Sequence, residues 1–304
     1  MNTKKTVLIT GGSGLIGRKL TSELQKNGFR VSWLSRKDIS VPDVHVYKWN
    51  IERNVIDRKA IEAAHVIVHL AGANIGARRW TKKRKQTIID SRIKSAELLL
   101  TALRESGKTL DVFVSASAVG YYGARTTEKV YSEEDSAADD FLGSTCRKWE
   151  EAANRFTHAS DRLVKLRTGV VLDAREGALP KMALPVKLGF GSSLGSGKQY
   201  IPWIHIDDIV GIYLKAIEDK AMQGAFNAVA PQVVTLDEFL RTLARVLKRP
   251  YFMPRVPAIV LKILLGEMSR LILEGSRISA DKVQKAGYKF KFDTVDNALA
   301  RIYG

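Results

Sequence analysis

The sequence predicts an α/β fold in which a doubly wound parallel sheet is joined to a smaller and less regular C-terminal part. The first observation is that short apolar runs alternate with helical patterns up to Leu172. Strands that are apolar along their whole length are buried on both faces, and their alternation with helices is typical of a parallel sheet. The second observation is that this regularity ends after Leu172, where glycine and apolar residues follow without a clean period.

The first strand is expected at 7–9, followed by a glycine-rich turn and by a helical pattern over 18–24. Further strands are expected, in chain order, at 31–35, 44–49, 66–70, 112–117 and 163–167. Helices between them, such as 91–104 and 146–156, supply the crossovers that parallel strands need.

The C-terminal part contains fewer regular elements. A strand at 226–229 could return to the sheet. Residues 236–247 form an amphipathic pattern with a capping signal at Thr235 and Glu238. A second helical region is expected over 256–273, opened by Pro257.

These patterns suggest two closely packed parts in a chain of 304 residues. Residues 1–172 would form the sheet domain, rejoined by about 203–230. Residues 173–304 would form a smaller substrate-binding part on the carboxyl edge of the sheet. Since no flexible linker separates the two, we expect one rigid unit.

The most informative motif follows the first strand. Gly11, Gly14 and Gly17 form the pattern G-x-x-G-x-x-G between a strand and a helix. In such a loop one glycine allows the tight turn, one lets a phosphate approach the backbone, and one lets helix and strand pack closely. The helix N-terminus then offers free N–H groups to a pyrophosphate. We therefore expect a Rossmann-type dinucleotide site with contacts from Gly11, Ser13, Gly14, Leu15, Ile16 and Gly17.

The end of the second strand indicates which dinucleotide binds. An acidic residue that holds a ribose 2′-hydroxyl is expected there, but the chain has Ser35, Arg36 and Lys37. A guanidinium would pair with a 2′-phosphate, and Asp38 comes one turn too late to be the obvious ribose ligand. Ser35 and Arg36 therefore favour NADP(H) over NAD, the plainer alternative being that Arg36 is a surface loop residue.

Composition limits the other function classes. The net charge of +17 fits either an electrostatic funnel for anions or a lysine-rich solvated surface. The dense run 82–85 is typical of an exposed helix start and has no interleaved aromatic residues, so no nucleic-acid partner is expected. A phosphorylated cofactor would itself use part of the charge.

The cysteine, histidine and hydropathy patterns exclude further kinds of site and segment. The single cysteine, Cys146, excludes an intramolecular disulfide, and the five histidines lack metal-ligand spacing, so no metal is expected. No stretch is apolar enough to cross a bilayer, and the first strand begins too close to Met1 for a signal peptide. We expect a cytoplasmic protein, and the oligomeric state stays open.

Several motifs together identify a family. The general ones are His69–Gly72, Ser115–Ser117 and Trp203–Ile209. The more specific ones are Arg79-Trp80, Asp90–Arg92, Gly120–Gly123, Trp149-Glu150, Arg167–Leu172, Gly195–Gln199 and the tail Pro257–Gly287. On these residues the chain resembles, nearly end to end, the extended short-chain dehydrogenase/reductases, the superfamily of nucleotide-sugar epimerases. Within it the chain is similar to an atypical epimerase branch with a C-terminal domain of unknown function, some members of which are labelled cell-division inhibitors.

The resemblance implies further contacts. Asn50 stands where relatives often have an aspartate that touches adenine, and Arg92 stands where many have an asparagine. The remaining expected cofactor contacts are Leu70, Ala71, Gly72, Gly169 and Val170. The superfamily counterpart of Ser117 hydrogen-bonds the substrate oxygen. His69, His205 and Asp207 are interpreted as packing or supporting residues.

One departure from the family pattern affects the chemistry directly. The superfamily uses Tyr-x-x-x-Lys on one helix, but Leu142 and Cys146 stand at those positions here. A phenol from Tyr121 or Tyr122 could replace the tyrosine, with Arg92 as the cation. Cys146 could be a nucleophile, although a lone helical cysteine is more often an inert packing residue. The third alternative is that no proton donor exists.

Two functions follow from this resemblance. The first is an NADP(H)-binding oxidoreductase or epimerase that acts by hydride transfer on a small polar substrate, such as an anion or a nucleotide sugar. Ser117 would orient the substrate oxygen, and Tyr122 or Tyr121 would supply the proton. The second is a non-catalytic NADPH-binding regulatory protein, for example one connected with cell division.

Overall fold

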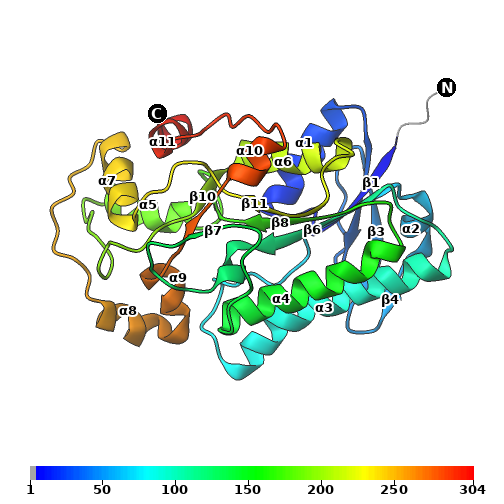
Figure 1. Cartoon of the computed structure of the whole chain (residues 1–304), viewed down its shortest axis with the longest axis horizontal. Helices are drawn as coiled ribbons and strands as arrows, with labels where there is room; N and C mark the ends of the chain where they lie inside the picture. The colour runs from blue at the N-terminus through cyan, green and yellow to red at the C-terminus, as the bar shows by residue number, and fades with distance from the viewer. Residues whose placement is uncertain (1–4) are drawn as a thin grey trace.

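The computed structural model describes residues 5–304, and its centre is an eight-stranded sheet of order β11-β8-β6-β5-β1-β2-β3-β4 (Figure 1). Seven strands are parallel: β1 (Thr6–Thr10), β2 (Arg30–Ser35), β3 (Val44–Asn50), β5 (Val66–His69), β6 (Val112–Ala118), β8 (Leu163–Thr168) and β11 (Gly224–Ala228). The eighth, β4 (Val55–Ile56), is a short antiparallel edge strand. The predicted parallel α/β sheet is confirmed.

Helices cover both faces of this sheet. On one face α1 (Leu15–Lys26) and α6 (Ile206–Glu218) pack into a core with β1, β6 and β8. On the other face a second core joins the sheet to α2 (Arg58–Ala63), α3 (Lys82–Glu105) and α4 (Phe141–Asn154). Along the central strands β1, β5 and β6, apolar side chains alternate between the two cores, as strands buried on both faces require.

The C-terminal part has its own core. It is formed mainly by α5 (Leu179–Lys187), α7 (Leu236–Val246) and α11 (Val295–Tyr303). Two small parallel pairs connect this part to the rest: β9 (Val170–Leu172) with β10 (Trp203–His205), and β7 (Val130–Tyr131) with β12 (Arg277–Ile278). The remaining helices are α8 (Ala258–Leu265), α9 (Arg270–Leu273) and α10 (Asp281–Lys285).

Several element boundaries differ from those expected. The helix expected over 91–104 begins at Lys82, because Thr81 caps it by accepting a hydrogen bond from the Arg84 N–H. The helix expected over 146–156 begins at Phe141, where the Asp140 carboxylate accepts from the Gly143 N–H at 2.9 Å. The region expected as one helix over 256–273 is broken at Gly266, whose φ of +60° lies in the left-handed region.

The sheet order fixes where a ligand can bind. From β1 the chain adds β2 and β3 on one side, whereas β5, β6, β8 and β11 lie on the other. Such a reversal leaves a crevice outside the carboxyl ends of the central strands, here β1 and β5. Among residues 5–304, no helix is both long enough and apolar enough to pass through a bilayer.

Candidate functional site

The glycine loop lies at the start of this crevice. Gly11 has a φ of +72°, and its carbonyl accepts a 3.0 Å hydrogen bond from the Gly14 N–H, which closes the turn. A side chain at Gly17 would come within 2.6 Å of the Gly11 and Gly12 carbonyl oxygens, so only glycine lets α1 approach the loop this closely. A Cβ at Gly14 would have one neighbour within 4 Å, the Gly11 oxygen at 3.2 Å, and otherwise open space.

The first turn of α1 is suited to an anion. Gly14 is its N-cap and supplies no side-chain cap, so the N–H groups of the first turn stay available. Ser13 and Gly14 are exposed, and Leu15 and Ile16 are half-buried at the start of the helix. These residues fit a pyrophosphate cradle.

The end of β2 adds a cation, Arg36, that pairs with no carboxylate in the described part of the chain. Arg36 is exposed. The hydroxyl of its neighbour Ser35 forms hydrogen bonds with the backbone of Lys37 and not with Arg36. The nearest acidic candidate in the sequence, Asp38, is paired with Lys48 at 2.8 Å. The loop therefore suits a 2′-phosphate.

The buried ring of His69 links the end of β1 to α3. Its two ring nitrogens lie 2.8 Å from the Thr10 hydroxyl and 3.1 Å from that of Ser95, and burial lowers its pKa to about 4. The Thr10 hydroxyl in turn accepts from the Ala71 N–H at 3.2 Å. His69 is thus neutral and fixes the loop of Leu70, Ala71 and Gly72, which fits the supporting role expected for it.

Arg92 lies beside that loop. Its Nη1 donates to the Ala73 and Ile88 carbonyls at 3.2 and 2.9 Å, and the guanidinium lies 4.7 Å from the Trp149 ring centroid. A Cβ at Gly72 would be 3.1 Å from the guanidinium carbon. Burial, reinforced by the charge of Arg84, lowers the pKa of Arg92 from its ordinary value. Arg92 is half-buried and pairs with no carboxylate among residues 5–304, and such a cation gains from an anionic ligand.

At the end of β6, Ser117 belongs to a buried ionic network. Its hydroxyl donates to Glu150 Oε1 at 2.7 Å. Arg167 donates to both oxygens of the same carboxylate, from Nε at 2.8 Å and from Nη2 at 3.0 Å. Burial alone would lower the pKa of Arg167, but the Glu150 carboxylate outweighs it and holds that pKa above its ordinary value.

The two candidate phenols differ in their surroundings. Tyr122 is buried, donates to Asn227 Oδ1 at 2.7 Å and accepts from Arg167 Nη1 at 2.9 Å. Burial raises the pKa of Tyr122 to about 12. Tyr121 is half-buried, and its ring lies 3.5 Å from the Arg167 guanidinium carbon. The packing therefore favours Tyr121 as the phenol that can meet a ligand and makes Tyr122 a poor proton donor.

At the two helix positions where the superfamily has tyrosine and lysine, this chain has two packed side chains. Leu142 and Cys146 are both buried on α4. A Cβ at Gly120 would be 3.4 Å from Leu142 Cβ and 3.8 Å from Cys146 Sγ, so the loop backbone covers both side chains. Burial raises the pKa of the Cys146 thiol to about 12, which keeps it protonated at neutral pH.

The other expected contacts also lie at strand ends. Asn50 ends β3, and its side chain accepts from the Arg53 N–H at 3.1 Å. Gly169 follows β8, where a Cβ would be 2.5 Å from the Pro202 oxygen, and the Val170 N–H donates to that oxygen at 2.7 Å. Because parallel strands share one carboxyl edge, these residues lie at the same edge of the sheet as the glycine loop.

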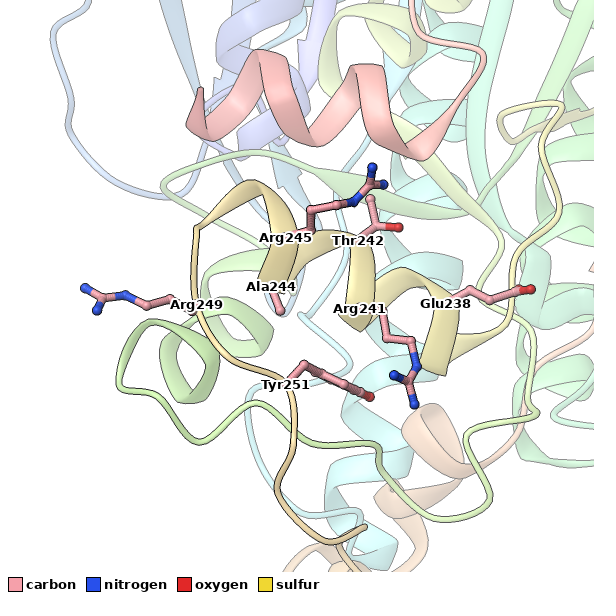
Figure 2. Close-up of a pocket in the computed structure, with 7 residues that line it drawn as sticks. All are labelled: Glu238, Arg241, Thr242, Ala244, Arg245, Arg249 and Tyr251. Carbon is pink, nitrogen blue, oxygen red and sulfur yellow. The ribbon is translucent and has the colours of Figure 1, made fainter.

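A separate open groove of about 470 Å³ lies along α7 and the segment after it (Figure 2). Arg241 pairs with Asp237 and Arg245 with Asp296, so carboxylates already neutralise two of its arginines. Figure 2 shows Arg249 pointing away from the other two. The groove therefore lacks convergent free charges, and we do not assign the site to it.

Comparisons with known proteins agree with this geometry. Residues 7–228 match the NAD dependent epimerase/dehydratase family, and residues 256–302 match a domain of unknown function, DUF1731. The chain belongs to the NAD-dependent epimerase/dehydratase family. This confirms the resemblance seen in the sequence, including the C-terminal domain.

Individual members of the family match along nearly the whole chain. An epimerase family protein of Staphylococcus saprophyticus is 36% identical over 303 residues, covering 97% of this chain and 98% of its own. The epimerase family protein YfhF of Bacillus subtilis is 35% identical over 302 residues, covering 97% of each. The crystal structure of the human epimerase family protein SDR39U1 with NADPH is similar at a TM-score of 0.87 and 32% identity, covering 98% of this chain and 99% of that one.

The part of the site that sequence reasoning missed is the support of Ser117. Glu150 and Arg167 were noticed as family motifs without a role, although a buried Glu on α4 facing a buried Arg on β8 forms the centre of the network. Asn227, whose side-chain oxygen accepts a hydrogen bond from Tyr122, belongs to no motif that the sequence shows.

Proposed function

We propose that this protein binds NADP(H) in the crevice between β1 and β5 and acts as an oxidoreductase or epimerase on a small polar substrate. The supporting observation is that one sheet edge brings together the uncapped start of α1, the exposed Arg36 and Ser117. The relative SDR39U1 was crystallised with NADPH, which supports the choice of nucleotide.

Each part of the cofactor would contact a different set of residues. Gly11, Ser13, Gly14, Leu15, Ile16 and Gly17 would hold the pyrophosphate, Ser35 and Arg36 the 2′-phosphate, and Asn50 the adenine. Leu70, Ala71, Gly72, Gly169 and Val170 would line the remaining length. Arg92 would meet a negative group of the cofactor or of the substrate. We assign substrate recognition to residues 173–304.

When bound, the nicotinamide supplies or accepts a hydride, and the protein must manage the accompanying proton. The Ser117 hydroxyl donates to Glu150 without a ligand, and to hold a substrate oxygen it would turn this hydrogen from the carboxylate to that oxygen. We assign proton transfer to the Tyr121 phenol, because Tyr122 is buried with its hydroxyl bonded on both sides. The Arg167 guanidinium stacks on Tyr121 and joins the two groups in one network.

Calorimetric titration of the full chain with NADPH and NADH tests the nucleotide. We expect NADPH to bind about ten to a hundredfold tighter, since a charge-assisted hydrogen bond contributes about 1.5–3 kcal/mol. Arg36→Glu should remove or invert this preference. Arg30→Glu changes an exposed arginine at the opposite end of β2 and should leave it intact. Equal affinities in the unchanged protein would contradict the assignment of Arg36.

A regulatory role is the second candidate function. It is favoured because Leu142 and Cys146 stand where the superfamily has its tyrosine and lysine, and the Gly120 backbone covers both side chains. NADPH oxidation across a panel of carbonyl compounds and nucleotide sugars separates the two functions. Turnover that depends on Ser117 supports the enzyme. Tight NADPH binding without turnover anywhere in the panel supports a protein that reports the state of the cofactor to a partner.

A further inference from the structure

Large exposed apolar side chains are concentrated in one region of the C-terminal part. Of the twelve in residues 5–304, nine lie between Leu184 and Phe190 or between Phe252 and Leu271. The helix α8 is the centre of this region, since Leu261 is its one buried residue and Ile263 and Leu264 are 67% and 63% exposed. Monomeric soluble proteins rarely leave such a patch without a function.

The two stretches of chain that carry these residues lie side by side. Gly191 pairs with Tyr251 and Leu194 with Val256 in isolated bridges. The Gly195 N–H donates to the Val256 carbonyl at 2.9 Å, and α8 starts two residues after Val256. Figure 1 shows α5, α7 and α8 at one end of the molecule. Phe190 and Phe252 therefore border a surface that continues onto α8.

The charges of residues 181–190 and 248–264 have one sign, and Glu267, three residues further on, is paired with Lys85. We define the basic apolar surface as residues 181–190 and 248–264. Neither segment contains an aspartate or a glutamate. Its exposed cations are Lys181, Lys187, Lys248, Arg249, Arg255 and Lys262. Because apolar and cationic side chains are mixed without acidic ones, the matching partner offers both hydrocarbon and negative charge.

We propose that the basic apolar surface docks on a membrane that contains anionic lipids. The apolar residues of α8 would enter the boundary between headgroups and acyl chains, while Lys262 and Arg255 would pair with lipid phosphates. Each lysine or arginine near such a surface contributes roughly a fivefold gain in binding. A second copy of this chain fits less well, because the contact would oppose two sets of cations with no acid between them.

Vesicle flotation of the full chain tests this docking. The probes are vesicles of phosphatidylcholine alone and vesicles with about one third phosphatidylglycerol. We expect flotation with the anionic vesicles, weakening as salt rises because the charges are screened. The neutral vesicles should bind at least about tenfold less.

Matched variants separate the apolar from the cationic contribution. Ile263→Ser with Leu264→Ser, and Lys262→Glu with Arg255→Glu, should each weaken anionic-vesicle binding by about tenfold or more. Val130→Ser with Val233→Ser changes exposed apolar residues elsewhere, and Lys220→Glu with Lys285→Glu makes the same charge change after α6 and on α10. Both controls should bind like the unchanged protein. All variants should keep the same affinity for NADPH, which shows that the fold and the cofactor site are intact.

Three results would overturn the proposal. One is failure to float with the anionic vesicles. Another is a stable dimer in solution that Ile263→Ser with Leu264→Ser dissociates, which would make the surface an interface between copies. The third is binding to polyglutamate without binding to vesicles, which would indicate an acidic protein partner instead.

Discussion

The Ser117 hydroxyl donates a 2.7 Å hydrogen bond to Glu150 Oε1 and so directs its hydrogen into the protein. Arg167 holds the same carboxylate with two further hydrogen bonds and stacks on the Tyr121 ring. The position of the Ser117 side chain is therefore supported by Glu150 on α4, which is itself held by Arg167 on β8. A group with a fixed orientation at the end of a strand is suited to meeting a ligand repeatedly in one geometry.

The first prediction concerns the stability of this network. Glu150→Gln should lower the free energy of unfolding by about 3–5 kcal/mol, because it removes the carboxylate that neutralises the buried Arg167 charge. Urea unfolding measures the effect. Glu151→Gln makes the same change at the exposed neighbouring position and should have almost no effect. A loss of less than about 1 kcal/mol at Glu150 would mean that water compensates Arg167.

The second prediction concerns turnover, measured as NADPH oxidation with whichever substrate of the panel reacts. Ser117→Ala and Tyr121→Phe should each lower it by roughly a hundredfold or more, because each removes a positioned hydroxyl. Tyr122→Phe serves as the matched control for the second phenol. It should mainly destabilise the protein by about 1–3 kcal/mol, since it leaves buried hydrogen-bonding groups of Asn227 and Arg167 without a partner. The opposite order for the two tyrosines would contradict our assignment of the proton donor.

Cys146→Ala provides a further control for the same assay. Its thiol is buried, with a pKa raised to about 12 by that burial, so removing it should cost some packing energy and almost no turnover. Loss of activity in this variant alone would make the cysteine the reactive group.

The sequence was sufficient for the positions of the main strands along the chain and for the glycine-rich turn after β1, because both depend on local patterns. A buried parallel strand is a continuous apolar run, and the turn after β1 requires glycine at Gly11 for its φ and at Gly17 for close approach. Helix starts were less predictable, because a single cap such as Thr81 or Asp140 extended α3 and α4 beyond their apolar patterns.

The support of Ser117 depends on contacts between residues far apart in the chain. Glu150 and Arg167 are 17 positions apart and meet only when α4 packs against β8. Asn227 reaches Tyr122 across 105 positions. No periodicity encodes such pairs, so the sequence left Tyr121 and Tyr122 as equal candidates, whereas the packing distinguishes them.

The third prediction concerns the phosphate loop. Gly14→Val should abolish binding of both NADPH and NADH while leaving the fold intact, because its side chain would enter the open space where the pyrophosphate is expected. Calorimetry measures binding, and far-ultraviolet circular dichroism checks the fold. Gly76→Val, in a loop with open space around the added Cβ, is the control. Normal nucleotide affinity in Gly14→Val would mean that this loop is a turn without a role in nucleotide binding.

The last prediction concerns pH. Burial lowers the pKa of His69 to about 4, whereas an unfolded histidine titrates near 6.5. Between these values the unfolded chain binds a proton that the folded protein does not, so acid favours unfolding. The stability from His69 is therefore fully present above pH 6.5 and lost as pH falls towards 4, by about 3 kcal/mol in all. Burial lowers the pKa of His205 to about 4 as well, so two histidines act in the same window. Urea unfolding between pH 7.5 and 4 should show this decline, His69→Gln and His205→Gln should each remove about half of the histidine-dependent part, and the double variant nearly all of it. An unchanged pH slope in His69→Gln would show that this ring titrates near 6.5 in the folded protein as it does in the unfolded chain, which would make it available as an acid near neutral pH.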